Sequence, residues 1–236
     1  TISREVQRNG GRKVYRAARA EQATWNRRQF ITSAAFAGAA FTSPVFTRTV
    51  NAGNKSLFRI SLAQWSLNKA FFSGELDTLD FARIARERFG IKAIEYVNQF
   101  YFDTLNDKLV NELRKRADSE GVASKLIMID REGDLGNPEA TERKKAVENH
   151  HRWADAAHAL GCHSIRVNAR SSGSWDEQMK LAADGLNRLA DYCSGLGLNV
   201  LVENHGGLSS NAQWLTGVMK LADNKAVGTL PDFGNF

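Results

Sequence analysis

Segments with the pattern of buried strands alternate with segments of helical spacing along residues 57–236. This alternation constrains the fold more than any other feature of the chain. One strand and the helix that follows it occupy about 30 residues, the length of a βαβ unit. Strands joined by helices run parallel, because the helix returns the chain to the same end of the sheet. Two α/β architectures fit this pattern, a doubly wound sheet and a (β/α)8 barrel.

The strand segments are rich in Val, Ile and Leu, and the helix segments carry apolar residues three and four positions apart. We expect strands at 58–66, 91–98, 124–130, 164–168, 200–203 and 227–233. We expect helices at 77–89, 107–120, 139–160 and 175–193, and a fifth helix capped by Ser209 or Ser210.

The fifth strand is the most informative segment, because it delivers ionisable side chains at its end. Residues 199–207 read Asn-Val-Leu-Val-Glu-Asn-His-Gly-Gly. A buried strand here ends in Glu203 and His205, and two glycines terminate it. Parallel α/β proteins carry their active sites at the carboxyl ends of strands. The alternative is that Glu203 is a carboxylate on the rim of the sheet and His205 a loop histidine.

Polar residues also follow the other expected strands. They are Gln64, Ser66, Glu95, Asn98, Asp130, Arg166, Asn168, Asp232 and Asn235. A barrel collects all its carboxyl strand ends around one axis, whereas an open sheet does not bring the first, third and fifth ends together. The first strand is not followed by G-x-G-x-x-G and the chain has no P-loop, so nucleotide-binding fingerprints are missing. These observations favour the (β/α)8 TIM barrel.

The net charge of +6 comes from the N-terminal segment. Residues 1–52 hold nine Lys or Arg and two Glu, whereas residues 53–236 hold 23 Lys or Arg and 24 Asp or Glu. A nearly neutral domain lacks the basic surface that attracts a phosphate backbone, so we expect no nucleic-acid partner. The two cysteines, Cys162 and Cys193, are too few for a disulfide scaffold and are expected in the core.

The N-terminal segment has the pattern of an export signal. Residues 25–52 place Arg27-Arg28 before a mildly apolar run without charge from Gln29 to Thr47, and small residues follow at 50–52. This resembles a twin-arginine signal, which implies recognition by the Tat export machinery and a periplasmic location. An uncleaved membrane anchor is the alternative. Residues 1–24 are basic and are expected to be disordered or to precede the true start, so residues 53–236 form the expected domain.

Several strand ends resemble a known family. The segments Val202-Glu203-Asn204-His205-Gly206-Gly207 and Pro231-Asp232-Phe233-Gly234-Asn235 are similar to the fifth and sixth strand ends of the sugar phosphate isomerase/epimerase family, the xylose-isomerase-like TIM barrels. Residues 127–130 and 164–170 also resemble this family. The resemblance covers about residues 57–236 and implies a (β/α)8 barrel.

In this family a divalent metal is held by a Glu after the fifth strand, an Asp after the sixth, a His or similar residue after the seventh and a Glu after the eighth. The resemblance assigns Glu203 and Asp232 to the first two positions. Eight units need about 250 residues, so this chain holds about six, and we expect it to be a fragment or truncated. Exposed edges on the first and last strands would make it poorly soluble or homo-oligomeric by itself.

The resemblance implies an isomerase or epimerase that moves a proton next to a carbonyl, through an enediolate, with Mn, Mg or Zn as the metal. Glu203 would be a ligand and a proton-transfer group, and His205 would orient substrate oxygens, bind metal or stabilise its loop. Trp65 is a candidate for stacking on a sugar, or a buried core residue. The remaining candidates for hydrogen bonds to sugar hydroxyls are Asn98, Arg166, Asn168 and Asn235. Alternatively, these polar residues cap strands, and Glu95 pairs with Arg166 or Lys125 inside the barrel.

Two other functions remain open. A family of metal-dependent abasic-site endonucleases shares this barrel, but it implies several histidines at strand ends. Only His205 qualifies here, because His150, His151 and His158 fall on the expected long helix and His163 precedes the fourth strand. An exported, non-catalytic carbohydrate-binding barrel is the second alternative, since binding a sugar does not require the full set of metal ligands.

Overall fold

The computed structural model describes residues 58–235, and these residues form the expected α/β domain. The basic segment 1–24 and the predicted export signal at 25–52 lie outside the described residues. Among the helices of the described part, none is both long enough and apolar enough to cross a membrane.

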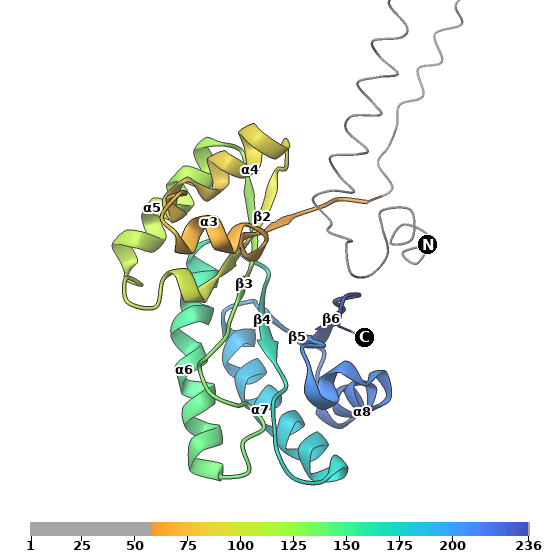
Figure 1. Cartoon of the computed structure of the whole chain (residues 1–236). Coiled ribbons are helices and arrows are strands. Elements are labelled where there is room, and N and C mark those ends of the chain that lie inside the picture. Colours follow the sequence, from red (N-terminus) through yellow and green to blue (C-terminus); the bar gives the residue numbers. More distant parts are fainter. Residues whose placement is uncertain (1–57, 236) are drawn as a thin grey trace, which may run out of the picture. The chain divides into compact units, whose positions relative to one another are not determined.

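Six parallel strands form one sheet, and their order in the sheet is their order along the chain (Figure 1). The strands are β1 Leu62–Ala63, β2 Ala93–Val97, β3 Ala123–Met128, β4 Ser164–Asn168, β5 Asn199–Glu203 and β6 Val227–Leu230. Each strand hydrogen-bonds to the one before it without any reversal of direction. A doubly wound sheet reverses its strand order at a switch point, so this order is that of a barrel.

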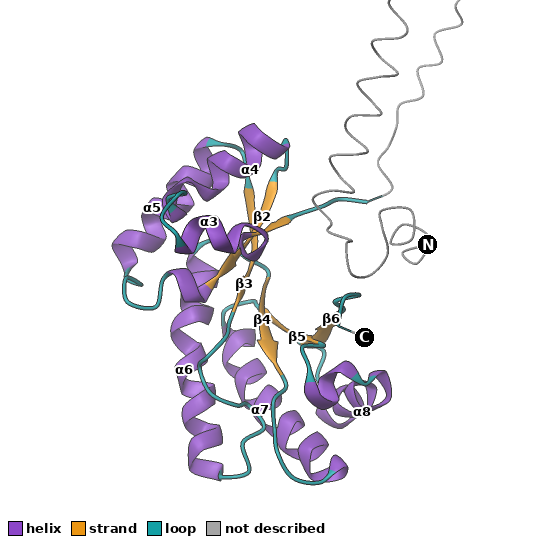
Figure 2. Ribbon diagram, in the orientation of Figure 1, coloured by secondary structure: helices purple, strands orange, loops and turns teal. Residues whose placement is uncertain are grey.

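The helices between the strands also follow one another in space (Figure 2). They are α3 Asn68–Phe72, α4 Phe81–Phe89, α5 Asp107–Ser119, α6 Ala140–Ala159, α7 Trp175–Gly195 and α8 Ala212–Ala222. From α4 to α8, each helix packs against the next one along the chain. A single layer of consecutive helices outside a parallel sheet is the arrangement of a (β/α)8 barrel, so the six strands and the helices between them confirm the predicted fold class as a partial barrel.

Several predicted element boundaries differ from the structure; the sixth strand, for example, ends at Leu230 and not at residue 233. Two of the differences have a clear physical reason. The first strand is limited to two residues, and Gln64–Leu67 form a turn of 3-10 helix instead. The buried Gln64 side chain accepts a hydrogen bond from the Val97 backbone N–H (3.0 Å) and donates one to the Tyr101 hydroxyl (2.8 Å), so it replaces strand pairing here. Helix α8 is capped by Asn211, whose side chain accepts from the N–H groups of Gln213 and Trp214, and not by Ser209 or Ser210.

The hydrophobic core lies between the sheet and the helix layer. Val200 and Val202 of β5 are fully buried in it, as are Trp153 of α6 and Trp214 of α8. Cys162 and Cys193 are buried thiols, and burial raises the pKa of each to about 12. Both therefore stay protonated and pack as small core residues, as predicted.

Candidate functional site

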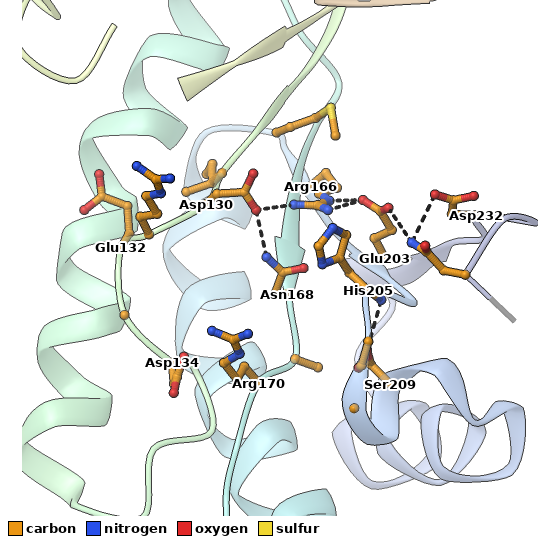
Figure 3. A pocket seen from close by; sticks show the side chains of 18 of the residues that line it. Asp130, Glu132, Asp134, Arg166, Asn168, Arg170, Glu203, His205, Ser209 and Asp232 are labelled. Atoms are coloured by element: carbon orange, nitrogen blue, oxygen red, sulfur yellow. Dashed lines mark hydrogen bonds and ion pairs between the residues drawn. The ribbon is translucent and has the colours of Figure 1, made fainter. Parts of the chain in front are cut away.

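A polar cavity of about 780 Å³ opens at the carboxyl ends of the strands (Figure 3). Its volume lies within the range of small-molecule binding sites. Seven of the predicted site residues line it: Trp65, Arg166, Asn168, Glu203, His205, Asp232 and Asn235. Asn98 is not among the lining residues. The sheet therefore gathers residues that are far apart in sequence around one space.

The register of the sheet sets three polar side chains at one level. Asn168 of β4 is paired with Glu203 of β5. Met128 of β3 is paired with Arg166, and Asp130 lies two residues further on. Side chains two residues apart in a strand point to the same side, so Asp130, Asn168 and Glu203 face the cavity together and Arg166 lies one layer below them.

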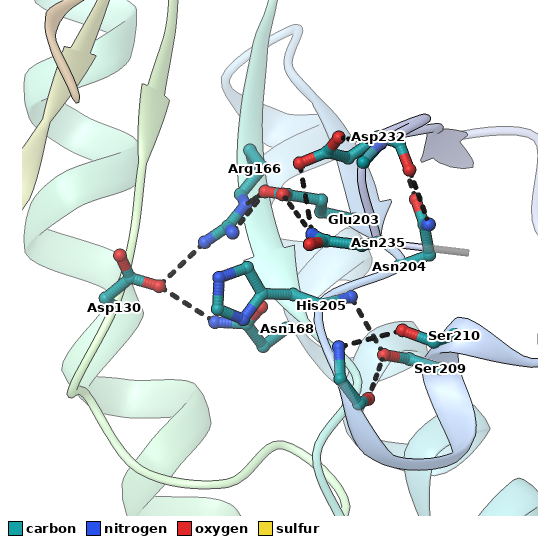
Figure 4. Close-up of polar contacts among 12 residues, drawn as sticks. Asp130, Arg166, Asn168, Glu203, Asn204, His205, Ser209, Ser210, Asp232 and Asn235 are labelled. Atoms are coloured by element: carbon teal, nitrogen blue, oxygen red, sulfur yellow. Dashed lines mark hydrogen bonds and ion pairs between the residues drawn. The ribbon is translucent and has the colours of Figure 1, made fainter. Parts of the chain in front are cut away.

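Arg166 joins the two carboxylates of this layer (Figure 4). Its Nη1 donates to Asp130 Oδ1 at 2.7 Å, and its Nε and Nη2 both donate to Glu203 Oε2. The Arg166 side chain is 1% exposed. Removing one partner from such a buried ion pair costs about 3–5 kcal/mol, because the remaining charge is left in a poorly solvating interior. Arg166 is thus fixed by protein groups. Both of its contacts with Glu203 use Oε2, so Oε1 remains for contacts with other groups.

The predicted pairing of Glu95 with Arg166 or Lys125 is wrong. The Glu95 carboxylate accepts a hydrogen bond from the Ser61 hydroxyl, and within residues 58–235 it forms no ion pair. Glu95 is paired with Leu126, which is paired in turn with Ser164. It therefore lies two residues below Arg166, about 6–7 Å along the strand direction, whereas Asp130 lies above and within reach.

Asp130 is held as a carboxylate by its partners. Burial acts to raise its pKa, but the charge of Arg166 and hydrogen bonds from Arg166, Asn168 and Gln99 outweigh burial, so the pKa lies below its usual value. The Asn168 amide donates to Asp130 Oδ1 at 2.9 Å and Gln99 donates to Oδ2 at 3.0 Å. The Asn168 side-chain oxygen is buried and has no partner in the described part of the chain.

Two asparagines, each at the end of one strand, hydrogen-bond in the same way to the backbone just after the neighbouring strand. The Asn98 side chain donates to the Asp130 carbonyl (2.9 Å) and accepts from the Asp130 N–H (3.0 Å). The Asn204 side chain donates to the Asp232 carbonyl (2.9 Å) and accepts from the Asp232 N–H (2.6 Å). Both asparagines are fully buried. Each one fixes the backbone of an aspartate that faces the cavity, so Asn98 is a strand-end clamp whose amide is already occupied.

Glu203 and Asp232 converge on one point, where the Asn235 side chain lies. The Asn235 amide nitrogen is 3.4 Å from Glu203 Oε1 and 3.0 Å from Asp232 Oδ2. Two carboxylates at one point are oxygen donors of the kind that Mg²⁺, Mn²⁺ and Zn²⁺ accept. Within residues 58–235, no three or more His, Cys, Asp and Glu side chains are grouped to hold a metal. The two carboxylates thus fit a divalent cation in kind and would supply two ligands to one.

The loop after β5 presents His205 to the cavity. Gly206 and Gly207 have φ angles of 77° and 58°, a left-handed conformation that glycine adopts without steric cost. The backbone N–H of His205 donates to Ser209 Oγ at 3.0 Å, and that of Gly206 donates to Ser210 Oγ at 3.0 Å. The loop is therefore held by backbone groups and serine hydroxyls. The His205 ring forms no hydrogen bond with any other described residue.

Trp65 is 42% exposed, which excludes the alternative that it is a buried core residue. Its ring packs edge-on against Phe72, with ring centroids 6.2 Å apart, and at a tilt against Phe100, at 6.5 Å. These contacts support the ring and leave an aromatic surface on the cavity wall.

The structure adds lining residues that the sequence reasoning did not select: Gln99, Arg131, Glu132, Asp134, His150, Arg170 and Gln178. Arg131 directly follows Asp130, one of the polar residues expected at a strand end, and Arg170 lies two residues after the candidate Asn168. Their position after a strand was therefore an available signal. His150 lies on α6, as expected, yet its ring reaches the cavity wall, which no local pattern indicates.

Comparisons with known proteins agree with this fold. Residues 82–236 match the family described as xylose isomerase-like TIM barrel. The solved structures with a similar fold include D-psicose 3-epimerase with D-tagatose from Clostridium cellulolyticum H10. Its TM-score is 0.60 and its identity 16%, over 74% of this chain and 63% of that one. They also include the 3-keto-D-glucoside 4-epimerase YcjR from E. coli, with a TM-score of 0.57 and 18% identity over 66% of this chain and 63% of that one.

A third similar structure is a xylose isomerase-like TIM barrel protein from Mycobacterium smegmatis in complex with magnesium. Its TM-score is 0.52 and its identity 20%, over 66% of this chain and 55% of that one. The chain thus spans 63% of the length of each of the two epimerases. At these identities the likeness shows the fold. No curated protein matches the sequence.

Proposed function

Because this chain belongs to the xylose isomerase-like TIM barrel family, we propose that it carries the divalent-metal site of an isomerase or epimerase. The substrate is a sugar or a related hydroxy-carbonyl compound. The observation that carries the proposal is the convergence of Glu203 and Asp232 on the Asn235 amide at the edge of a polar cavity. The similar folds of sugar 3- and 4-epimerases support this substrate class.

The proposed reaction moves a proton at a carbon next to a carbonyl, which requires a base and stabilisation of the resulting enediolate. Glu203 and Asp232 would hold the metal, which stabilises the negative charge that develops on the substrate oxygen. Mg²⁺ in particular is commonly bound by one or two carboxylates, with water and substrate oxygens as its other ligands.

The residues around these carboxylates have separate roles in this proposal. Arg166 binds Glu203 Oε2 and so orients Oε1 toward Asn235, where it is placed to bind the metal or accept the proton. The unpartnered ring of His205 orients substrate oxygens. Asn235 donates to hydroxyls, and Trp65 provides a face for stacking against the apolar side of a sugar ring.

We expect Glu203→Gln and Asp232→Asn each to weaken Mn²⁺ binding at least about tenfold, a loss of about 1.4 kcal/mol, measured by calorimetric titration. The two variants differ in a second respect. Only Glu203→Gln removes the charge that pairs with buried Arg166, so only this variant also loses stability to urea, by about 3–5 kcal/mol. Turnover of a ketohexose, followed by NMR as deuterium incorporation next to the carbonyl in D₂O, should cease in both.

The matched control is Asp134→Asn, which removes one cavity carboxylate that is not part of the proposed metal site. It changes the net charge equally and should leave Mn²⁺ binding unchanged. Equal effects of Asp134→Asn and Asp232→Asn, or no Mn²⁺ binding by the unaltered chain, would contradict the proposed metal site.

One observation favours the non-catalytic alternative. The described residues supply two acidic ligands at the candidate metal site and not three. If the chain binds a ketohexose equally well with and without Mn²⁺ and incorporates no deuterium, an exported carbohydrate-binding barrel is the better description.

A further inference from the structure

The cavity extends beyond Glu203 and Asp232 to two arginines without an acidic partner. Arg131 follows β3 and Arg170 follows β4, and both line the cavity. Within the described range, neither guanidinium group forms a hydrogen bond or an ion pair. The third lining arginine, Arg166, is buried between two carboxylates. Arg131 and Arg170 are therefore the cavity arginines whose donors are available to a ligand.

The backbone that carries these arginines is fixed. The Gly136 N–H donates to the Arg170 carbonyl at 2.9 Å, and the Ser171 hydroxyl donates to the Gly136 carbonyl at 2.5 Å. The loop after β3 also packs closely on α7. A Cβ atom on Gly185 of α7 would lie 1.8 Å from the Leu135 carbonyl oxygen of this loop. The loops after β3 and β4 are thus hydrogen-bonded to each other and packed on α7, and such contacts lower the entropy lost when a ligand binds.

Arg131 has a backbone conformation that suggests a specific role. Its φ angle is 61°, in the left-handed region that side chains with a Cβ atom rarely adopt. The other non-glycine residue with positive φ in residues 58–235 is Asp223, which ends α8, where this conformation is common. Arg131 ends no helix. Strained residues of this kind cluster at ligand sites.

The charges around the two arginines favour a ligand with one negative charge. Three lining carboxylates already have an arginine partner: Asp130, Glu132 and Glu203. Asp134 lies beside Arg170 in Figure 3, away from Asp232, but no ion pair joins it to any residue in the described part. With Arg152, the partner of Glu132, the cavity has four positive and five negative side chains, a net charge of −1. A divalent cation held by Glu203 and Asp232 would change this to +1, which a single carboxylate neutralises.

His150 adds a hydrogen-bond acceptor to the same wall. The side chain is 3% exposed, and its Nδ1 lies 2.7 Å from the Ala146 carbonyl oxygen, which can only accept. Nδ1 therefore carries the proton in the neutral ring, and Nε2 has no partner among residues 58–235. An unpartnered acceptor suits a hydroxyl group.

We propose that Arg131 and Arg170 bind a carboxylate at the end of the substrate remote from the metal site, so that the substrate is a sugar acid. The inference rests on the proposed isomerase or epimerase function and specifies its substrate class. A guanidinium group pairs with a carboxylate through two parallel hydrogen bonds, and His150 accepts from a hydroxyl of the same ligand.

Three ligands that differ only at C6 test this proposal: D-fructose, D-fructuronate and D-fructose 6-phosphate. Calorimetric titration of the unaltered chain with Mn²⁺ present should show D-fructuronate binding at least about tenfold more tightly than D-fructose. Arg170→Gln and Arg131→Gln should each remove most of this preference and leave D-fructose binding unchanged. The control is Arg88→Gln on α4, outside the cavity, which alters the net charge equally and should preserve the preference.

The outcomes separate this inference from the function on which it rests. Equal binding of D-fructose and D-fructuronate overturns the carboxylate site and leaves the sugar isomerase proposal standing. Tighter binding of D-fructose 6-phosphate than of D-fructuronate also overturns it, because the arginines would then select a phosphate. If none of the three ligands binds, the proposed function fails and the inference fails with it.

Discussion

At the scale of single residues, the cavity combines satisfied charges with unsatisfied ones. Arg166, Asp130 and Glu203 form a buried, mutually paired unit. The Arg131 and Arg170 guanidinium groups and the His205 ring have no partner among the described residues. Buried charges must be paired to be tolerated, so the unpaired groups near solvent are the ones available for binding.

His150 makes stability depend on pH. Burial lowers its pKa, and the nearby charge of His151 lowers it further, against the Ala146 carbonyl, Glu132 and Asp130, which raise it. The folded chain therefore binds fewer protons here than the unfolded chain, whose histidine has a pKa of about 6.5. We expect the free energy of unfolding to fall as the pH drops below about 6.5, by at most about 1.4 kcal/mol per pH unit for this one group.

The measurement is urea unfolding between pH 7 and pH 5 for the unaltered chain, His150→Gln and the control His163→Gln, whose residue is exposed. Only His150→Gln should flatten the pH dependence. A slope that both variants share with the unaltered chain would show that other groups cause it.

At the scale of secondary-structure elements, the same clamp recurs at two strand junctions. Asn98 joins the end of β2 to the second residue after β3, and Asn204 joins the end of β5 to the second residue after β6. Each amide satisfies a backbone N–H and a carbonyl where the strand ladder has ended. The clamped residues are Asp130, which pairs with Arg166, and Asp232, the proposed metal ligand.

The two clamps form a matched pair of variants. Asn98→Ala and Asn204→Ala each lose two buried hydrogen bonds, so each should lower the free energy of unfolding by about 1–3 kcal/mol, measured in urea. Only Asn204→Ala should also weaken Mn²⁺ binding in calorimetric titration, because it frees the backbone of Asp232. Equal losses of Mn²⁺ affinity in both variants would mean that the effect is general loosening.

At the scale of the whole molecule, the basic charge and the folded domain lie in different parts of the chain. The positive excess is confined to residues 1–52, and the domain that follows is close to neutral. We propose that residues 25–52 direct export through the twin-arginine pathway, which carries folded proteins, and that the domain acts in the periplasm.

A fusion of residues 1–57 to a fluorescent reporter tests this proposal in a bacterium that has the twin-arginine pathway. Replacing Arg27 and Arg28 by lysine should retain the reporter in the cytoplasm, as measured by cell fractionation. Replacing Arg4 and Arg8 by lysine is the control and should not affect export. A reporter that stays in the cytoplasm with the unaltered leader would refute the export signal.

The sequence by itself determined the order of elements and many of the polar residues that line the cavity. Alternation of strand and helix patterns depends on the spacing of apolar residues, which is a local property. The (β/α)8 fold class and the family are confirmed. Glu203 and Asp232 were selectable because parallel strands end at one edge of the sheet, so that a polar residue after a strand faces a common space.

Only the tertiary structure decided the partners of these residues. Register placed Glu95 two residues below Arg166 and Asp130 within reach of it. The packing of α6 brought His150 to the cavity wall. Both outcomes depend on how distant segments are aligned, and a shift of one residue in a strand turns each side chain to the opposite face. Local patterns fix which side chains reach the carboxyl edge of the sheet, whereas register and helix packing fix which of them meet.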